Sequence, residues 1–504
     1  MSMNKNNTIP FEKKDFIKII TPKQFEIKSS YLANQERKKI DYNITIYMFL
    51  PKSLNITSET YESHNFYSDL ISYTRLKVPK IELGILIKQL SALVERFATN
   101  ESTQIERRAL KSIVCSYASY LQSFFKDLKE KGVNHKRTCV LLERIRKLDA
   151  VKKNMYLLRT KSTNEKFIFL VESAAEYLSL TTQYYLLMVN MYLKTCDDEH
   201  KNLINKISEL VHEELLFCKK NNFPIVSNNE YKNEEVVFRY SVFKKFFYSV
   251  LNLYQERRDA RARIKEFYYS IAAGIAMFFT TVTVFLAQPK LGNFTMQFFI
   301  VLVVSYMLKD RIKEGYRNYF DKKMDVITYD FKEKIYDFEK QSFLGFVKER
   351  FRFTQSDKLS QHIIEARLKK TPGRLTTWYL GEDIIKYEKN ITLFSENIQE
   401  HYNHTIGGIH NIMRFDISKF LNKMDTTKIP LYDEEGNTYY GDKVYHVNII
   451  VEFMTENERT LHKARLVLCK KGIKRIELPE YDIKIFRKNN LDFLQKSREK
   501  SIKI

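Results

Sequence analysis

Two neighbouring stretches of the chain, Phe267–Gln288 and Leu291–Leu308, contain no charged residue and limit the possible folds more than any other feature. At about 1.5 Å of rise per residue, a helix over the first is roughly 33 Å long and a helix over the second roughly 27 Å. Both lengths are close to the hydrocarbon thickness of a bilayer, about 30 Å, in which a backbone must satisfy its own hydrogen bonds. Only Pro289 and Lys290 separate the stretches. We therefore expect an antiparallel transmembrane hairpin of two helices within 257–320.

Basic residues lie beside only one end of this predicted hairpin. One group precedes the first stretch and another follows the second: Arg257, Arg258, Arg261, Arg263, Lys265, Lys309, Arg311 and Lys313. The connection between the stretches carries Lys290 alone. Because basic flanks stay in the cytoplasm, this asymmetry predicts a multi-pass protein with both termini cytoplasmic. We expect the membrane to be a bacterial inner membrane.

The interior of the predicted hairpin has no ionisable side chain, which argues against a transporter. Small residues recur at four-residue spacing, as Ser270 with Gly274 and Ala272 with Ala276. Such pairs let helix backbones approach closely. They could serve packing within one hairpin or packing between protomers.

The chain is strongly basic, with 84 Lys and Arg against 61 Asp and Glu and a net charge of +23. The basic residues are spread along the predicted soluble parts, among acidic neighbours, and form no compact arm. Beside a bilayer this charge favours binding to anionic inner-leaflet lipids, at about 1 kcal/mol for each basic residue near the surface. Nucleic acid is the less favoured partner.

The part of the chain before the hairpin combines strands with a helical bundle. Alternating apolar residues predict a strand over Ile40–Leu50, and Gln24–Leu32 is its expected partner within the N-terminal region 1–80. Apolar residues at helical spacing predict an antiparallel cytoplasmic bundle over 81–256. Its helix Phe167–Leu193 has only Glu172 and Glu176 as charges and is expected to be the central, buried helix. These two glutamates could instead bind a metal, but the Glu-x-x-His partners of such sites are missing.

The part after the hairpin is predicted to be helical first and antiparallel β afterwards. Lys309–Phe351, which lacks proline, predicts one long helix or two, and cytoplasmic helices are expected over 321–400. Alternation in Tyr445–Phe453 and a turn at Asp433–Asn437 predict an antiparallel β domain over 401–483, with a further strand over Ile412–Phe420. We expect the N-terminal strands to join this sheet, and a basic tail, 484–504, follows it. The predicted fold class is an α+β membrane protein.

One group of residues could bind a metal ion, namely the three histidines His401, His404 and His410. Their spacing matches no standard site, and the neighbouring Gly407-Gly408 more simply predicts a turn. The sequence has no phosphate-binding loop, nucleophile elbow or kinase signature. It therefore predicts no cofactor and no catalytic residue.

These patterns favour an integral membrane protein that anchors large cytoplasmic domains as an interaction or signalling scaffold. The lipid bilayer is its first expected partner, and protein partners or a homo-oligomer are the others. An alternative is an oligomeric pore-forming or gating effector, in which Thr280, Thr281 and Thr283 could line a narrow pore. A membrane-tethered enzyme that uses the histidine group is a third alternative.

Overall fold

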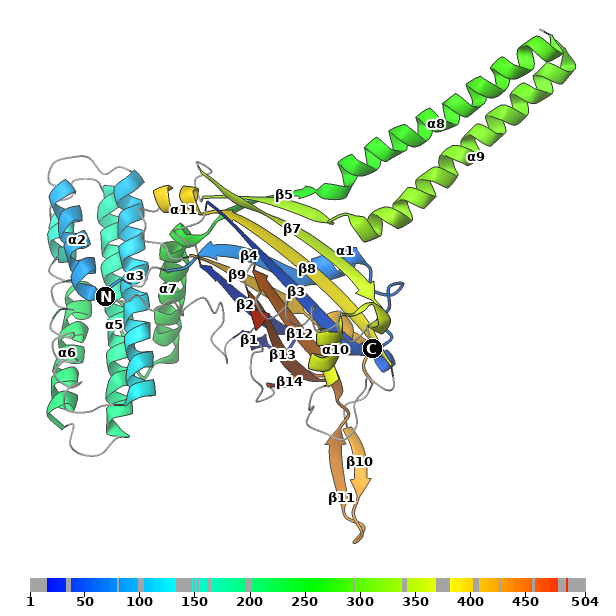
Figure 1. The fold of residues 1–504 in the computed structure, drawn as a ribbon. Coiled ribbons are helices and arrows are strands. Elements are labelled where there is room, and N and C mark those ends of the chain that lie inside the picture. Colours follow the sequence, from blue (N-terminus) through cyan, green and yellow to red (C-terminus); the bar gives the residue numbers. More distant parts are fainter. Residues whose placement is uncertain are drawn as a thin grey trace, which may run out of the picture. The chain divides into compact units, whose positions relative to one another are not determined.

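The computed structural model describes residues 16–32, 38–78, 81–97, 104–132, 147, 151, 154–160, 165–195, 201–292, 295–337, 342–368, 381–401, 408–425, 428–455, 458–478 and 486–487. The chain forms two compact units. Unit 1 comprises Met1–Thr74, Tyr254–His401 and His410–Ile504, and unit 2 comprises Arg75–Leu253 and Tyr402–Ile409. The fold is mixed α and β, with antiparallel sheets formed in part by strands near the C-terminus, as predicted (Figure 1).

A large antiparallel sheet is the main feature of unit 1. Its strand order is β14-β13-β12-β3-β8-β7-β6-β5, and β15 pairs with β13. The strands are β3 (Lys39–Pro51), β5 (Tyr254–Asp259), β6 (Phe331–Tyr336), β7 (Phe343–Thr354), β8 (Glu382–Phe394), β12 (Tyr445–Thr455), β13 (Glu458–Cys469), β14 (Gly472–Glu477) and β15 (Phe486–Arg487).

Strand β3 lies inside this sheet, between β12 and β8. The predicted strand Ile40–Leu50 is confirmed, and Ile44, Ile46 and Met48 on one side of it are buried. The predicted strand Tyr445–Phe453 is also confirmed as part of β12. An N-terminal strand and a C-terminal strand are thus direct neighbours in one sheet.

A separate four-stranded sheet has the order β1-β2-β9-β4. Its strands are β1 (Ile17–Thr21), β2 (Gln24–Leu32), β9 (Gly408–Asp416) and β4 (Leu70–Leu76). The predicted pairing of Gln24–Leu32 with Ile40–Leu50 is wrong, because β2 forms a local hairpin with β1 while β12 and β8 occupy both edges of β3. The strand expected over Ile412–Phe420 starts and ends earlier, as β9, and lies in this smaller sheet instead of beside β12.

The predicted turn at Asp433–Asn437 is confirmed. It joins β10 (Lys428–Tyr432) to β11 (Thr438–Asp442), which pair as a two-stranded hairpin. The Asp433 carboxylate accepts hydrogen bonds from the backbone N–H groups of Glu435 and Asn437, at 3.0 and 2.8 Å. Aspartate is favoured in such turns because its side chain can bond its own backbone in this way.

The long helix expected over Lys309–Phe351 is wrong beyond Ile327, where the chain continues as β6 and β7. These strands do alternate, but their buried face carries Glu333 and Glu349 among apolar residues. Because buried carboxylates interrupt an apolar alternation, the period of two is hidden in the sequence. The region 321–400, expected to be helical, therefore supplies three adjacent strands of the large sheet, β6, β7 and β8.

Short helices cover parts of unit 1. They are α1 (Ser63–Asp69), α10 (Gln361–Leu368), α11 (Ser395–His401) and α12 (Ser418–Asn422). Helix α10 packs on the large sheet through a cluster of buried side chains formed by Tyr47, Phe49, Leu359, Ile363, Ile384 and Ile450. It lies within 321–400, the region that the sequence predicted to be helical.

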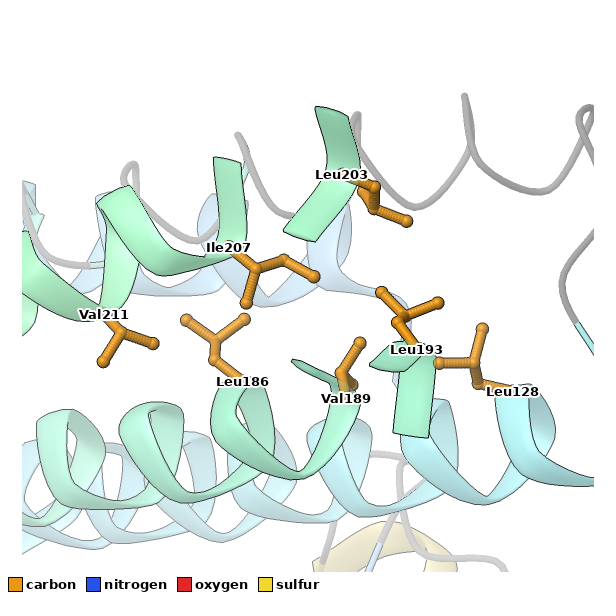
Figure 2. Close-up of a cluster of buried hydrophobic side chains, with 7 residues drawn as sticks. All are labelled: Leu128, Leu186, Val189, Leu193, Leu203, Ile207 and Val211. Carbon is orange, nitrogen blue, oxygen red and sulfur yellow. The ribbon is translucent and has the colours of Figure 1, made fainter. Parts of the chain in front are cut away.

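Unit 2 contains the helices α2 (Leu83–Phe97), α3 (Gln104–Lys131), α5 (Glu165–Lys194), α6 (Lys201–Lys220) and α7 (Glu230–Tyr248). Helix α5 contacts α3, α6 and α7, and most of its side chains are buried, as expected for a central helix. Figure 2 shows one end of its core, where side chains of α3, α5 and α6 meet: Leu128, Leu186, Val189, Leu193, Leu203, Ile207 and Val211.

Candidate functional site

A helical hairpin projects from the edge of the large sheet (Figure 1). Helix α8 (Ala260–Leu291) follows β5 without a break, and helix α9 (Met296–Ile327) returns to β6. Because β5 and β6 pair with each other, and Asp259 lies opposite Phe331, the hairpin is an insertion between two adjacent strands. Helix α8 continues through Pro289 and ends at Gly292, whose φ of 71° is in the region that glycine adopts without strain.

The two helices contact each other through small side chains. Ala272, Ala276 and Thr280 recur every four residues on α8 and are buried. The Thr280 hydroxyl donates a hydrogen bond to the carbonyl of Ala276 at 3.1 Å and lies 3.5 Å from the carbonyl of Ser305 on α9. This face lets the backbones approach closely, whereas Ser270 and Gly274, the other pair noted in the sequence, lie on the exposed side of α8.

Large apolar side chains are exposed on both helices. Those at least half exposed are Phe267, Met277, Phe278, Phe285, Leu286, Met296, Phe299, Ile300, Tyr306, Met307 and Tyr319. Exposed apolar surface on this scale is typical of a site that meets a membrane or another protein. By length and composition, α8 is the one helix among the described residues that could cross a membrane, over Ala260–Lys290.

Helix α9 differs from α8 because its charge-free part is short. That part runs from Met296 to Leu308, and it is followed directly by Lys309, Asp310 and Arg311. At 1.5 Å per residue it is only about 20 Å long, less than the hydrocarbon thickness of about 30 Å. Among the described residues, one helix therefore has an apolar stretch long enough to cross a bilayer, whereas the sequence predicted two.

The apolar parts of the two helices are also offset along the hairpin. The ring of Tyr268 stacks on that of Phe320 with the centroids 4.6 Å apart, and the Tyr269 hydroxyl donates to the Asp321 carboxylate at 2.8 Å. These contacts mark one end of a section of the hairpin, and the contact of Thr280 with Ser305 marks the other end. Within this section, the charged part of α9 runs beside the first half of the apolar stretch of α8. A charged residue at the centre of a bilayer costs about 2.5–3.5 kcal/mol on insertion scales, so this part of the hairpin is unsuited to the hydrocarbon core.

At the base of the hairpin, one buried carboxylate, that of Asp330 between α9 and β6, binds the start of α8. Its Oδ2 accepts hydrogen bonds from the Tyr67 hydroxyl and the backbone N–H of Phe351, each at 2.7 Å. Arg261 in the first turn of α8 forms an ion pair with the same carboxylate, and the backbone N–H of Ala260 donates to the Asp330 carbonyl at 3.2 Å. Burial, and next the negative charge of Asp330, raise the pKa of Tyr67, so the phenol keeps its proton and acts as the donor.

The contacts of Asp330 with Tyr67, Arg261 and Phe351 are called the junction below. Next to the junction, a row of paired charges crosses strands β5 to β8. The Arg257 guanidinium lies over the Phe331 ring, 3.7 Å from its centroid, and its Nε is 3.5 Å from Glu333. Its Nη2 is 3.8 Å from Glu349, which in turn pairs with the fully buried Lys389 at 3.0 Å. Burial, and next the charge of Glu349, raise the pKa of Glu333. Since buried charges are tolerated when paired, these contacts explain how carboxylates can occupy the inner face of β6 and β7.

These junction residues were not identified from sequence, apart from Arg257 and Arg261 as flanking basic residues. Tyr67 and Asp330 are far apart in the chain and meet only because α1 packs beside β7. One local signal was available. The Asp259 carboxylate accepts from the backbone N–H groups of Arg261 and Ala262, at 2.8 and 3.2 Å, and aspartate before an apolar helix is typical of an N-cap.

The other basic residues that the sequence analysis named as flanks lie at different positions along the hairpin. Arg258 lies in β5, Lys265 pairs with Asp321 at 3.2 Å, and Lys309 lies over the Tyr306 ring at 4.4 Å. Arg311 and Lys313 are on the charged part of α9. The side chain of Arg263 lies outside the described residues.

The histidine group is placed only in part. His410 lies in β9, where its Nδ1 is 2.7 Å from the Ser30 hydroxyl. His404 and the side chain of His401 lie outside the described residues, so a site formed by all three stays a prediction. Among the residues that the structure describes, no group of three or more His, Cys, Asp and Glu side chains could hold a metal ion.

The two glutamates of α5 each bind an arginine. Arg239 on α7 holds the buried Glu176 with two hydrogen bonds, at 2.6 and 2.5 Å. Glu172, four residues earlier, pairs with Arg159 at 2.7 Å. Each carboxylate therefore has a basic partner of its own within unit 2.

These features define an α+β protein with a helical hairpin inserted between the last two strands at one edge of an antiparallel sheet. Comparison of the chain with protein-family models, curated proteins and solved structures finds no match. The functional argument therefore depends on the geometry of the chain itself.

Proposed function

We propose that the protein is a membrane-anchored scaffold, in which the hairpin inserts into a bilayer and holds its two folded units at the cytoplasmic face. The observation that carries this proposal is the band of exposed apolar side chains at the distal end of both helices. On α8 it includes Phe278 and Phe285, and on α9 Phe299 and Met307. Burying such surface stabilises the inserted state by about 25 cal/mol for each Å² removed from water.

The proposed membrane boundary lies near Lys309 on α9. Tyr306 is one turn earlier, and the Lys309 ammonium lies over its ring, an arrangement typical of the headgroup region. The charged part of α9 and the neighbouring part of α8 then remain in the cytoplasm. This position keeps both basic flanks on the same side of the membrane, as the positive-inside rule requires.

The pore-forming alternative receives no specific support from the threonines of α8. The hydroxyls of Thr281 and Thr283 donate to the carbonyls of Met277 and Phe279, at 2.9 and 2.8 Å, and Thr280 bonds Ala276. They are thus engaged by the backbone of their own helix. An anchor needs no polar path through the bilayer and is the simpler function for this hairpin.

Membrane fractionation of the expressed full chain tests the proposal. We expect the protein to stay in the membrane pellet after washing at high salt and at alkaline pH, and to be released by detergent. Release by salt alone would mean a peripheral, electrostatic association, and recovery in the soluble fraction without washing would refute the anchor. Leakage of a small dye from vesicles containing the protein would favour the pore instead.

A further inference from the structure

Three cations occupy directly opposite positions on three adjacent strands at the base of the hairpin. Arg258 of β5 lies opposite Lys332 of β6, which lies opposite Lys348 of β7. Like charges placed opposite each other across strands are destabilising. This row, Arg258, Lys332 and Lys348, is called the cation row below.

On the reverse face of the same strands, charged residues lie opposite residues of the other sign. There the charges alternate in sign, from Arg257 to Glu333 and from Glu349 to Lys389, and they form ion pairs. Among the described residues, Arg258 is the only member of the cation row with a carboxylate partner, which is Glu256 at 2.6 Å. Within the described part of the chain, Lys332 and Lys348 form no ion pair, and their ammonium groups lie over the rings of Phe346 and Tyr329, at 4.9 and 5.3 Å.

The cation row lines a groove with a volume of about 490 Å³ between the sheet and the start of α8. Ile264 and Asp259 line the α8 side, and Tyr329 lines the sheet side. The Asp259 carboxylate is engaged by the first backbone N–H groups of α8, as described above. The Tyr329 hydroxyl accepts a hydrogen bond from Asn390 at 2.6 Å, which holds its ring beneath Lys348.

We propose that this groove is a binding site for a phosphate-bearing anion with two or more negative charges. Two strand spacings of about 4.8 Å make the cation row about 10 Å long, so it can contact successive phosphate groups at once. Such a ligand would relieve the repulsion within the row, and hydrogen bonds between ammonium or guanidinium groups and phosphate are among the strongest available to side chains. The inference is independent of whether the hairpin enters a membrane.

The test is a binding measurement on the full chain in detergent with inorganic triphosphate as the probe. We expect saturable binding and a rise in the unfolding temperature with probe concentration, because a ligand that binds the folded state stabilises it. The variants Lys332→Gln and Lys348→Gln should each weaken binding by about tenfold or more, since each removes a charge-assisted contact. Without the probe they should unfold at the same temperature as the parent or higher, because each also removes repulsion.

Lys334→Gln is the matched control. Lys334 lies two residues further along β6 on the same face, but its neighbours across the strands are Glu256 and Phe346 and it does not line the groove. We expect its affinity for triphosphate to stay within about twofold of the parent, because no contact in the groove is lost. Equal losses in all three variants would overturn the proposal, and so would a parent protein that binds neither triphosphate nor the anionic vesicles described next.

A second arm identifies the source of the phosphate. The same proteins are mixed with vesicles of neutral lipid and with vesicles containing an anionic phospholipid. Binding to triphosphate that depends on Lys332 and Lys348 supports a soluble ligand, and the same dependence with anionic vesicles alone supports a lipid headgroup. Independence of both lysines in both arms would refute the site.

Discussion

Tyr268 of α8 stacks on Phe320 of α9 with ring centroids 4.6 Å apart, and this contact sets the offset between the two helices of the hairpin. Because of it, the first half of the apolar stretch of α8 lies beside the charged part of α9. The two halves of α8 therefore have different surroundings although their sequences are equally apolar. This difference leads to a direct test of the proposed membrane anchor and of its depth.

Phe285 and Phe267 form a matched pair for that test, since both lie on α8 and their exposed fractions are 72% and 65%. We expect Phe285→Arg to weaken membrane insertion by about 3 kcal/mol, because the arginine would enter the hydrocarbon core. Phe267→Arg should have little effect, because that position lies beside the charged part of α9. The measurement is the fraction of each variant that resists alkaline extraction. Equal losses would mean that the membrane boundary lies at Phe267 and that the proposed depth is wrong.

The junction at Asp330 should be important for stability. We expect Asp330→Asn to lower the free energy of unfolding by about 3 kcal/mol, because it leaves Arg261 without its partner. Chemical denaturation of the detergent-solubilised protein measures this change. The control is Glu396→Gln, which breaks the exposed pair with Lys38 at 3.3 Å and should cost less than about 1 kcal/mol. Similar losses for both variants would show that the junction contributes no more than a surface ion pair.

The two glutamates of α5 offer a second comparison within one helix. The side chain of Glu176 is 2% exposed and that of Glu172 is 37% exposed. We expect Glu176→Gln to destabilise the protein by about 3 kcal/mol, because Arg239 loses a buried bidentate partner. Glu172→Gln should cost less than about 1 kcal/mol, as for other exposed pairs. Denaturation followed by circular dichroism measures both, and a larger loss at Glu172 would contradict this assignment.

His462 on β13 should make stability depend on pH. Burial lowers the pKa of His462 to about 4 in the folded protein, whereas an unfolded histidine titrates near 6.5. The unfolded chain therefore binds the proton first. The stability contributed by the neutral imidazole is complete above pH 6.5 and is lost as the pH falls toward 4, by up to about 3 kcal/mol.

The variant His462→Leu isolates this contribution, because it keeps an apolar side chain of similar size and cannot titrate. We expect the free energy of unfolding to fall less steeply between pH 6.5 and pH 4 in this variant than in the parent. His64→Leu, at an exposed position on α1, should retain the slope of the parent. Identical slopes in all three proteins would show that folding does not lower the pKa of His462.

Several elements could be predicted from sequence because their signals are local. The apolar length of α8, the alternation of β12 and the Asp433–Asn437 turn each depend on a few consecutive residues, and each is found in the structure. The buried helix α5 was equally recognisable, since its two charges sit near one end of a long apolar stretch. Helical and extended backbones impose their own side-chain periods, so a short window is sufficient to identify them.

The functional geometry depends on contacts between distant segments and could not be predicted in this way. Strands β6 and β7 resembled a helix because Glu333 and Glu349 face inward, and only pairing with Arg257 and Lys389 makes that burial tolerable. The cation row exists only because the register of three strands aligns residues that are far apart in sequence.

The sequence by itself determined that this chain contains an apolar helical hairpin with basic residues on both flanks. It also determined that a helical segment precedes the hairpin and that antiparallel strands follow it. Tertiary structure alone decided that the two helices are offset. As a result, the first half of the apolar stretch of α8 lies beside the charged part of α9. Tertiary structure also decided that the start of α8 binds the buried carboxylate of Asp330, which follows α9 in the chain. The physical reason is that periodicity and hydrophobicity act within a segment, whereas register and charge pairing arise only when separate segments pack together.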